Sequence, residues 1–511
     1  MSADRPAAAA DVVVIGGGGS GMAAAITAAE LGRKVILLEK NPRLGGSTAW
    51  SVGSVTSSCT PHQIRAGILD SPEEHWADYK VLAGERAARD NFELSAVMVR
   101  NLPDTFRWLL TNGLEFMGPV SEAPHRRPRM HNILPNSRAF PYHLGRRCRK
   151  VGVDVRLGTR ALDLVKQDGR IARVRAAGPD GREYLIETNS VVLAAGDYSA
   201  SPEFKAQLVS AEAATVDPVN ATATGDGFRL AMAHGATMVN GDVLLGPTLR
   251  FVPPARNLLQ MIPPWRWLTR FMRLAMEHLP PALLRPFIMR FLVTAVGPET
   301  ALYREGAILV NKLGARFTDE VQSPNGGTSL QPGRLAYIVF DARVAATFSA
   351  YPNFISTAPG IAYAYLDDYR RARPDIYRCA PTLSALASRL GIAPDALQDT
   401  VDAYNAGRGP EGVGGRGTRP PLAEGPYYAL GPVRTYVVST DGTLPVTLRH
   451  EVLDGSGRAI PGLFAAGSNG QGGMLLLGHG HHLGWAFTSG RLAGKEAAFF
   501  RPARPAPDSS P

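Results

Sequence analysis

The chain of 511 residues is longer than one hydrophobic core usually serves, so we expect two packed domains. Hydrophobic residues make up 45% of it and charged residues 20%, which excludes a disordered chain and a fibrous protein. The formal net charge of +10 suits an anionic partner, but a generally basic proteome explains it more simply; no Lys- and Arg-rich block with interleaved aromatics occurs, so we exclude nucleic acid.

A strand, a glycine-rich turn and a helix are predicted at the start of the chain. Residues 11–15 form a β-branched run, typical of a strand buried on both faces, and Gly16-Gly-Gly18-Gly-Ser-Gly21 follows directly. We expect Gly16 to permit a tight turn, Gly18 to let the backbone approach a pyrophosphate, and Gly21 to let helix and strand pack closely. The amides at the helix N-terminus would then face the phosphates.

A second apolar strand, residues 35–38, ends at Glu39. Its carboxylate stands about 20 residues after the glycines, where it can accept hydrogen bonds from both ribose hydroxyls. A glycine-rich loop of purely structural use would leave Glu39 unexplained. Strand, turn, helix, strand and acid in this order therefore predict a dinucleotide-binding fold.

The segment after Glu39 distinguishes between dinucleotides. Its sequence, Lys40-Asn-Pro-Arg-Leu-Gly-Gly46-Ser-Thr48, resembles the loop that wraps FAD in the flavoprotein superfamily of fumarate reductases, succinate dehydrogenases and ketosteroid dehydrogenases. Small residues suit such a loop, because backbone amides must come within hydrogen-bond distance of the cofactor. In succinate dehydrogenases a histidine of this loop bonds covalently to FAD. Ser47 occupies that stretch here, so the resemblance implies non-covalent FAD.

Three later segments resemble the same superfamily and appear in the same order. They are Thr224-Gly-Asp-Gly227, then Gly306-Ala-Ile-Leu-Val-Asn311 with Gly314-Ala-Arg-Phe317, then Pro461-Gly-Leu-Phe-Ala-Ala-Gly467. The resemblance covers residues 11–494 and is closest in character to the ketosteroid dehydrogenase-like members. The motif and the resemblance together predict these FAD-binding residues: Gly16, Gly18, Ser20, Gly21, Glu39, Lys40, Gly45, Gly46, Ser47, Thr48, Ala161, Ala195, Gly196, Asp226, Gly467, Leu483 and Gly484.

The resemblance also implies the domain organisation. We expect an α/β protein with a Rossmann-like FAD-binding domain built from residues 1–241 and 439–500, and an inserted α+β capping domain, residues 242–438. Residues 501–511 are expected to be a disordered tail. In relatives the cap closes over the flavin, and the substrate lies between the domains.

Residues 263–279 and 283–296 predict two amphipathic helices, too short to span a bilayer. Arg266, Arg270 and Arg273 lie opposite an apolar face that includes Leu268 and Phe271. The simpler interpretation is that these helices cover the core of the cap or line an apolar substrate tunnel. The alternative is peripheral contact with a membrane. The three cysteines are far apart and form no CxxC pair, so we expect a cytoplasmic protein without a structural zinc.

Three positions that bind dicarboxylates in fumarate reductases carry other residues here. The proton-donating arginine falls at Pro324, a second arginine at Leu477, and a histidine at Gly246. A dianion without guanidinium partners is held poorly, which makes fumarate and succinate unlikely substrates. The tyrosine that ketosteroid dehydrogenases carry at the first of these positions is also missing.

A glycine amide that polarises the substrate carbonyl in ketosteroid dehydrogenases is matched by Gly480, whereas the tyrosine beside it is matched by Leu476. The replacement of charged ligands by the apolar run 474–477 indicates an apolar substrate. We therefore hypothesise desaturation beside a carbonyl, or its reverse, with hydride transfer to or from flavin N5 and Gly480 N–H stabilising an enolate.

The same loop carries three histidines, in Gly478-His-Gly-His-His482. His479 and His481 are the candidates for the proton-transfer group, with Tyr303 and Arg304 as alternates. We expect no metal, because adjacent histidines converge poorly on one ion. Two alternatives remain: a reductase of an unsaturated carboxylate, held by Arg304 and the histidines, and a flavin-binding electron-transfer component without a soluble substrate. The electron donor or acceptor is not indicated.

Overall fold

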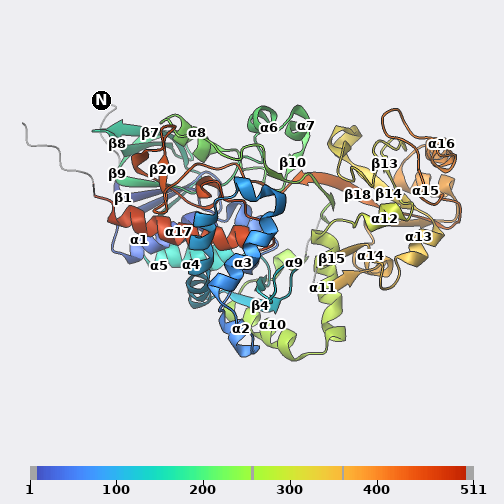
Figure 1. The fold of residues 1–511 in the computed structure, drawn as a ribbon, viewed down its shortest axis with the longest axis horizontal. Helices are drawn as coiled ribbons and strands as arrows, with labels where there is room; N and C mark the ends of the chain where they lie inside the picture. The colour runs from blue at the N-terminus through green and yellow to red at the C-terminus, as the bar shows by residue number, and fades with distance from the viewer. Residues whose placement is uncertain (1–7, 255–257, 359–361, 502–511) are drawn as a thin grey trace, which may run out of the picture.

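The computed structural model describes residues 8–254, 258–358 and 362–501. Figure 1 shows an elongated α/β molecule with two bodies, one containing both ends of the chain and one built from the middle. The long strand β18, Tyr427–Val437, runs from one body into the other. The predicted tail lies outside the described residues except for Arg501.

The first body is organised around a mainly parallel sheet in the order β20-β21-β9-β1-β2-β6, with β7 and β8 continuing from β9. Val14 in β1 pairs with Leu37 in β2 and with Val192 in β9. β1 begins at Ala8, three residues before the predicted start, because residues 8–10 pair with residues 186–188. The strands are β1 Ala8–Ile15, β2 Val35–Glu39, β6 Asp154–Leu157, β7 Arg160–Gln167, β8 Arg170–Ala177, β9 Glu183–Leu193, β20 Glu451–Leu453 and β21 Ala459–Ala465.

Two helices pack closely on each other and on this sheet: α1, Gly19–Glu30, and α17, His481–Phe499. Glycines permit the contact, since a Cβ on Gly490 would overlap the carbonyl of Ser20, and one on Gly494 would overlap that of Ala24. The remaining helices of this body are α2 Pro61–Arg65, α3 Pro72–Ala83, α4 Phe92–Thr111, α5 Ala139–Lys150, α6 Pro202–Leu208, α7 Ala211–Thr215 and α8 Asp226–Met232. A small antiparallel sheet lies at its edge: β3 Ser54–Thr56, β5 Met130–Leu134 and β4 Glu115–Val120.

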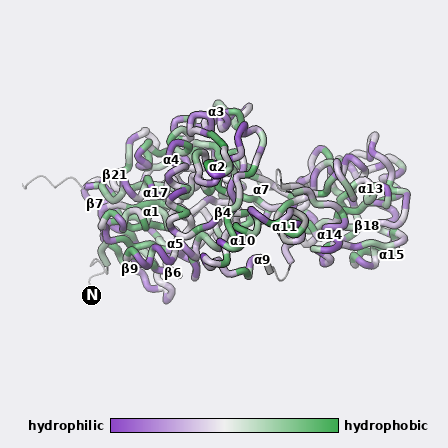
Figure 2. Tube along the Cα trace, turned by 90° about the horizontal axis from the view of Figure 1, so that it is seen from below, coloured by the Kyte–Doolittle hydropathy of each residue, from purple (hydrophilic) through white to green (hydrophobic). Residues whose placement is uncertain are grey.

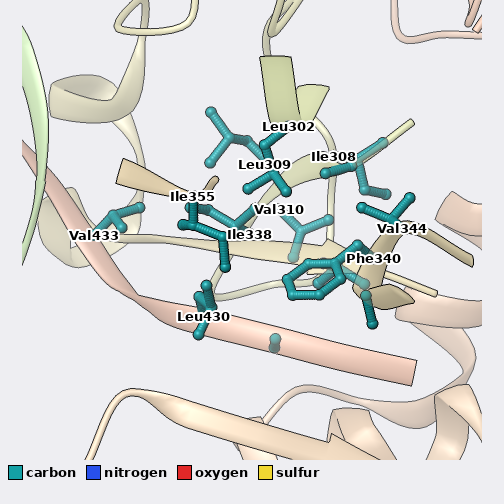
Figure 3. Close-up of a cluster of buried hydrophobic side chains, with 14 of the residues drawn as sticks. Leu302, Ile308, Leu309, Val310, Ile338, Phe340, Val344, Ile355, Leu430 and Val433 are labelled. Carbon is teal, nitrogen blue, oxygen red and sulfur yellow. The ribbon is translucent and has the colours of Figure 1, made fainter. Parts of the chain in front are cut away.

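The second body contains a six-stranded sheet in which β18 pairs with β10, β12, β14 and β17, and β14 pairs with β13. Its buried side chains come mostly from β13 and β14 and the helices around them (Figure 3). The strands are β10 Asp217–Pro218, β12 Thr248–Phe251, β13 Ile308–Asn311, β14 Ala336–Phe340 and β17 Tyr377–Ala380. The helices are α12 Ala301–Arg304, α13 Ala342–Thr347, α14 Leu366–Ala372, α15 Leu383–Leu390 and α16 Pro394–Asn405.

The two predicted amphipathic helices are present as α10, Arg266–His278, and α11, Pro281–Ala295, preceded by the short α9, Leu258–Met261. α11 packs on the second body and places Met289 and Val293 in its core. α10 instead packs against β4 of the first body, where Arg270 and Arg273 bind Glu115 at 3.2 and 3.1 Å. Core packing therefore accounts for α11 and not for α10. Within the described ranges, no helix has the length and apolarity needed to cross a bilayer.

Candidate cofactor and active site

A cleft of about 820 Å³, open to solvent, lies where β1, β2 and β9 end. Most predicted cofactor-binding residues meet there, although they come from distant parts of the chain. The following predicted residues line it: Gly16, Gly18, Ser20, Glu39, Lys40, Gly46, Ser47, Thr48, Ala161, Ala195, Gly196, Asp226 and Gly467.

The glycines of the cleft fall into two groups that reveal whether a ligand or the protein requires them. A Cβ on Gly16 would overlap the backbone of Ala194, and one on Gly21 would overlap the carbonyl of Gly16. These two glycines are required by packing. A Cβ on Gly18 would meet only a carbonyl oxygen at 4.0 Å, and one on Gly196 would meet nothing within 4 Å. No protein atom needs Gly18 to lack a side chain, whereas the backbone of Gly196, with φ of 82°, favours glycine by itself. The open space beside both residues fits a closely bound ligand.

The first turn of α1 provides the donors that a phosphate group would need. Its N-cap, Gly18, makes no side-chain capping bond, and the first amides of a helix have no helical acceptor. One of them, Gly19 N–H, donates to Thr48 Oγ1 at 3.0 Å. The next residue, Ser20, lines the cleft, where the helix dipole favours an anion.

Glu39 is buried at the end of β2 and is held by three hydrogen bonds. Its Oε2 accepts from Gly17 N–H at 2.7 Å, and its Oε1 accepts from the backbone and side-chain amides of Asn41, both at 2.8 Å. A carboxylate offers about four acceptor sites, so roughly one remains. Glu39 can therefore accept from one ribose hydroxyl as it stands, rather than from the two expected.

Three charged side chains, Lys40, Arg160 and Asp226, line one part of the cleft and bind one another. Lys40 Nζ lies 2.6 Å from Thr224 Oγ1 and 3.0 Å from Asp226, and Arg160 binds the same carboxylate at 2.9 Å. Burial alone would raise the pKa of Asp226, but the two cations outweigh it and hold this pKa below its usual value. These bonds fix the Thr-Gly-Asp-Gly segment against the loop that follows β2.

Four predicted residues do not line the cleft. Gly21 is required by packing, as described above, and Gly45 donates its N–H to Gly17 O at 2.9 Å, which fixes the glycine loop. Leu483 belongs to the core, and a Cβ on Gly484 would overlap the side chain of Leu102. These four positions shape the cleft without forming its wall.

Several lining residues escaped the sequence analysis because they belong to no motif. Thr159 and Arg160 reach the cleft from the turn between β6 and β7, and Asn220 and Thr222 from the loop before α8. Asn220 also donates to Ser47 Oγ at 2.9 Å. Only the parallel order of the strands places these loops side by side.

The loop before α17 presents a histidine and a free amide. The carboxylate of Glu122 pairs with His479 Nδ1, and this hydrogen bond raises the pKa of the exposed histidine. The hydroxyl of Thr56 donates to His479 O at 2.7 Å and fixes the loop. Gly480, with φ of 86°, is the N-cap of α17, and its N–H has no hydrogen-bond partner among the residues that the structure describes.

His481 is directed into the protein, so it is not placed to meet a substrate. It is completely buried, its Nδ1 bonds Leu477 O at 2.6 Å, and its Nε2 lies 3.1 Å from Nε2 of His75. Burial lowers the pKa of His481 to about 3. The next histidine, His482, is half-buried and lies 3.6 Å from Asp441.

His75, His125 and His481 bring ring nitrogens within 4.8 Å of one another, as a metal site would. Arg129, however, lies 3.2 Å from His125 Nδ1, and a guanidinium can only donate. The proton of neutral His125 must then be on Nε2. Two rings remain with a free lone pair, fewer than the three or four ligands of a protein zinc site.

The alternates for proton transfer lie elsewhere. Tyr303 is buried in the core of the second body, where burial raises its pKa well above the usual value, and Arg304 is exposed on the same short helix.

The apolar run after β21, residues 474–477, was interpreted from the sequence as a sign of an apolar substrate, and the structure does not support that interpretation. Residues 474–476 are buried in the first body and fill its core, so they give no support for an apolar substrate.

Arg250 is a residue that the sequence analysis missed. It lies on β12 opposite Arg434, on the face away from the buried Leu249 and Phe251. It is half-buried, and burial lowers its pKa. Arg250 forms no hydrogen bond or ion pair with any residue in the described ranges. Its positive charge acts to lower the pKa of His479, against the larger effect of Glu122. No motif marks it.

A second cavity opens between the two bodies. It is lined by Gly246 and Pro324, two of the positions where fumarate reductases carry substrate ligands, together with Arg86, Arg89 and Asn325. The structure thus brings Gly246 and Pro324 together, as the resemblance implied, without a histidine or an arginine at either. Arg89 is paired with Asp242, which is also part of the cavity wall.

A family model described as "FAD binding domain" matches residues 11–256 and 275–476. Among curated relatives, a fumarate reductase (cytochrome) of Shewanella frigidimarina is 28% identical over 498 residues, which cover 93% of this chain and 74% of that protein. A vinyl phenol reductase of Lactiplantibacillus plantarum is also 28% identical, in an alignment of length 518 that covers 93% of this chain and 94% of that protein.

Solved structures share the fold. The open conformation of a flavocytochrome c3 fumarate reductase matches with a TM-score of 0.71 and 24% identity, over 96% of this chain and 78% of that chain. The 3-ketosteroid-Δ4-(5α)-dehydrogenase of Rhodococcus jostii RHA1 matches with a TM-score of 0.59 and 23% identity, over 97% and 98% of the two chains.

Proposed function

The chain belongs to the FAD binding domain family, and from that premise we propose that it is an FAD-dependent oxidoreductase acting on a carbon–carbon double bond, or on the corresponding single bond, beside a carbonyl. FAD, when bound, supplies the hydride donor or acceptor. The cleft beside Gly18 and Gly196 fits this cofactor, since its glycines leave room and its helix N-terminus supplies amides. Ser47 lines the cleft where a covalent histidine would stand, so we propose non-covalent binding.

The observation that carries the proposed reaction is the pairing of His479 with Glu122 beside the free amide of Gly480. The raised pKa of His479 keeps its ring protonated to higher pH, which suits a proton donor. His479 would give a proton to the carbon next to the carbonyl when the alkene is reduced, and accept it in the reverse reaction. Gly480 N–H would donate to the carbonyl oxygen and stabilise the developing enolate.

An apolar cyclic ketone is the first candidate substrate. Neither Pro324 nor Gly246 can bind a carboxylate through a charged side chain, although both line the cavity between the two bodies. The relative named a vinyl phenol reductase acts, as its name says, on a molecule without a carboxylate. Family membership alone would admit either kind of substrate.

An unsaturated carboxylate is the second candidate, and Arg250 favours it. A half-buried guanidinium without a partner is costly unless something binds it, and a carboxylate is its best partner. In this alternative Arg250 takes the role that the sequence assigned to Arg304. The two substrate classes differ in whether Arg250 binds a charge, so a panel of compounds separates them.

The test is anaerobic stopped-flow measurement of the flavin absorbance with cyclic ketones and with unsaturated or saturated carboxylates. We expect ketones to reduce the oxidised flavin, or enones to oxidise the reduced flavin, with the rate lowered about 100-fold or more in His479→Gln. His278→Gln, at an exposed histidine on α10, is the matched control and should react at the normal rate.

A response to carboxylates alone would establish the second candidate. Reaction with alcohols or amines instead, or with no compound of the panel, would contradict the proposal; the latter result would favour an electron-transfer component. Unchanged rates in His479→Gln would remove His479 as the proton donor while leaving the reaction class intact.

A further inference from the structure

The outward face of α10 is apolar and largely exposed to solvent. Trp267, Phe271 and Leu274 follow one another at helical spacing and are 65%, 66% and 46% exposed. Three large apolar side chains on one exposed face are unusual for a soluble monomer, which rarely exposes contiguous apolar surface of this kind.

The orientation of α10 is fixed by its opposite face. Thr269 is buried, and the guanidinium groups of Arg270 and Arg273 bind Glu115 of β4. Arg273 also binds Glu277 at 2.8 Å, one turn further along. These ion pairs hold the helix with its charged side toward the protein and its aromatic side toward solvent.

The apolar face continues onto neighbouring elements. α2 and α10 both contact β4; Figure 1 shows both helices at the lower edge of the molecule, and Figure 2, seen from below, shows β4 between them. We define the α10 surface by the exposed large apolar residues of α2, α9, α10, the start of α11 and the turns beside them: Ile64, Leu69, Met261, Trp265, Trp267, Phe271, Leu274, Leu279 and Leu283.

The charge around the α10 surface is positive. Arg270 and Arg273 share Glu115, and Arg285 is paired with Asp368, so these three arginines add little to the surface charge. Arg266 is exposed between the two tryptophans, and Arg65 is exposed on α2. Tryptophan side chains favour the boundary between lipid headgroups and acyl chains, and arginines there attract anionic headgroups.

We propose that the α10 surface docks the protein on an anionic lipid bilayer, with α10 lying in the plane of the interface. A helix of 13 residues cannot span the bilayer, but one apolar face with adjacent cations matches an interfacial helix. A second copy of the chain would bring the same arginines against each other, so the positive charge favours lipid over self-association. The inference does not depend on the proposed reaction.

The experiment is co-sedimentation of the full FAD-loaded chain with vesicles of phosphatidylcholine alone, or with phosphatidylglycerol added. Wild type should bind the anionic vesicles, more weakly at high salt, with a blue shift of tryptophan fluorescence. Trp267→Ser/Phe271→Ser/Leu274→Ser should bind about 100-fold more weakly. The matched control is Leu313→Ser/Tyr351→Ser/Leu448→Ser, three exposed apolar residues elsewhere, which should bind like wild type.

Circular dichroism and flavin content establish that each variant is folded, which is expected because all six side chains are exposed. The proposal is overturned if wild type binds neither kind of vesicle, or if the α10 variant binds as well as wild type. Loss of a concentration-dependent dimer in the α10 variant, without vesicle binding by wild type, would assign the surface to a second copy.

Discussion

Two glycine-to-alanine substitutions, three residues apart, should have opposite effects. In Gly18→Ala the new methyl group projects into the cleft, where the nearest protein atom lies 4.0 Å away, and φ of −75° suits alanine. The free energy of unfolding of the apoprotein should change by less than about 1 kcal/mol, because the lower entropy of the unfolded chain offsets the poorer N-cap that alanine makes. In Gly21→Ala the methyl group overlaps the carbonyl of Gly16 inside the contact between strand and helix. This apoprotein should lose about 1–3 kcal/mol.

FAD binding should show the reverse order of severity for the folded proteins. The methyl group of Gly18→Ala occupies the space where the pyrophosphate approaches the backbone, and one or two charge-assisted hydrogen bonds are lost at about 1.5–3 kcal/mol each. The Kd for FAD should rise at least about 10-fold, and up to about 10,000-fold if both bonds are lost. Urea denaturation of the apoproteins and fluorescence titration with FAD measure the two quantities. Normal FAD affinity in Gly18→Ala, or wild-type stability in Gly21→Ala, would refute the division of the glycines into two groups.

Three further predictions concern single side chains. Glu122→Gln removes the partner that raises the pKa of His479, so the decline of alkene reduction with rising pH should begin at lower pH than in wild type; an unchanged pH–rate profile would refute the role of the pair. Arg250→Gln should raise the KM for unsaturated carboxylates about 10-fold or more and leave the KM for ketones nearly unchanged. An equal change in the two KM values would show that the guanidinium binds no charged substrate group. Arg129→Met should destabilise the fold by about 3–5 kcal/mol, because it leaves the buried carboxylate of Asp70 without its cation, although Asp78 keeps Arg126. The exposed control Arg182→Met should cost under about 0.5 kcal/mol in thermal denaturation, and comparable losses would contradict this.

The residues that line the cleft were largely predictable because their signals are local. Gly16, Gly18 and Glu39 follow from one strand–turn–helix–strand pattern. Thr159 and Asn220 could not be found in this way. They reach the cleft through the order of strands in the sheet, which no short stretch of sequence encodes.

The candidate active site was less predictable because it depends on side-chain direction. The resemblance matched Gly480 to a carbonyl-binding amide, and the structure makes it the N-cap of α17. The sequence could not tell that His481 points inward to His75 while His479 points outward to Glu122. Adjacent residues at the start of a helix face different directions, and tertiary contacts decide which direction is buried. The same limitation explains Tyr303, which lies close to a family motif but packs in the core.

The amphipathic pattern of residues 263–279 predicted a helix, which is present as α10. The simpler expectation, that this helix covers the core of the cap, was wrong, because α10 packs against β4 of the first body. A hydrophobic stripe indicates that one face of a helix favours burial, but it does not indicate whether protein or lipid covers that face. The structure shows that the charged stripe of α10 is the one held by the protein, through Glu115.

The central claim is that the cleft beside Gly18 and Glu39 binds FAD without a covalent bond. The direct measurement is the visible spectrum of the purified protein, followed by acid precipitation and quantification of FAD in the supernatant. We predict a yellow protein that releases about one FAD per chain. A protein that stays colourless after incubation with FAD, or one that retains the flavin in the precipitate, would contradict the account.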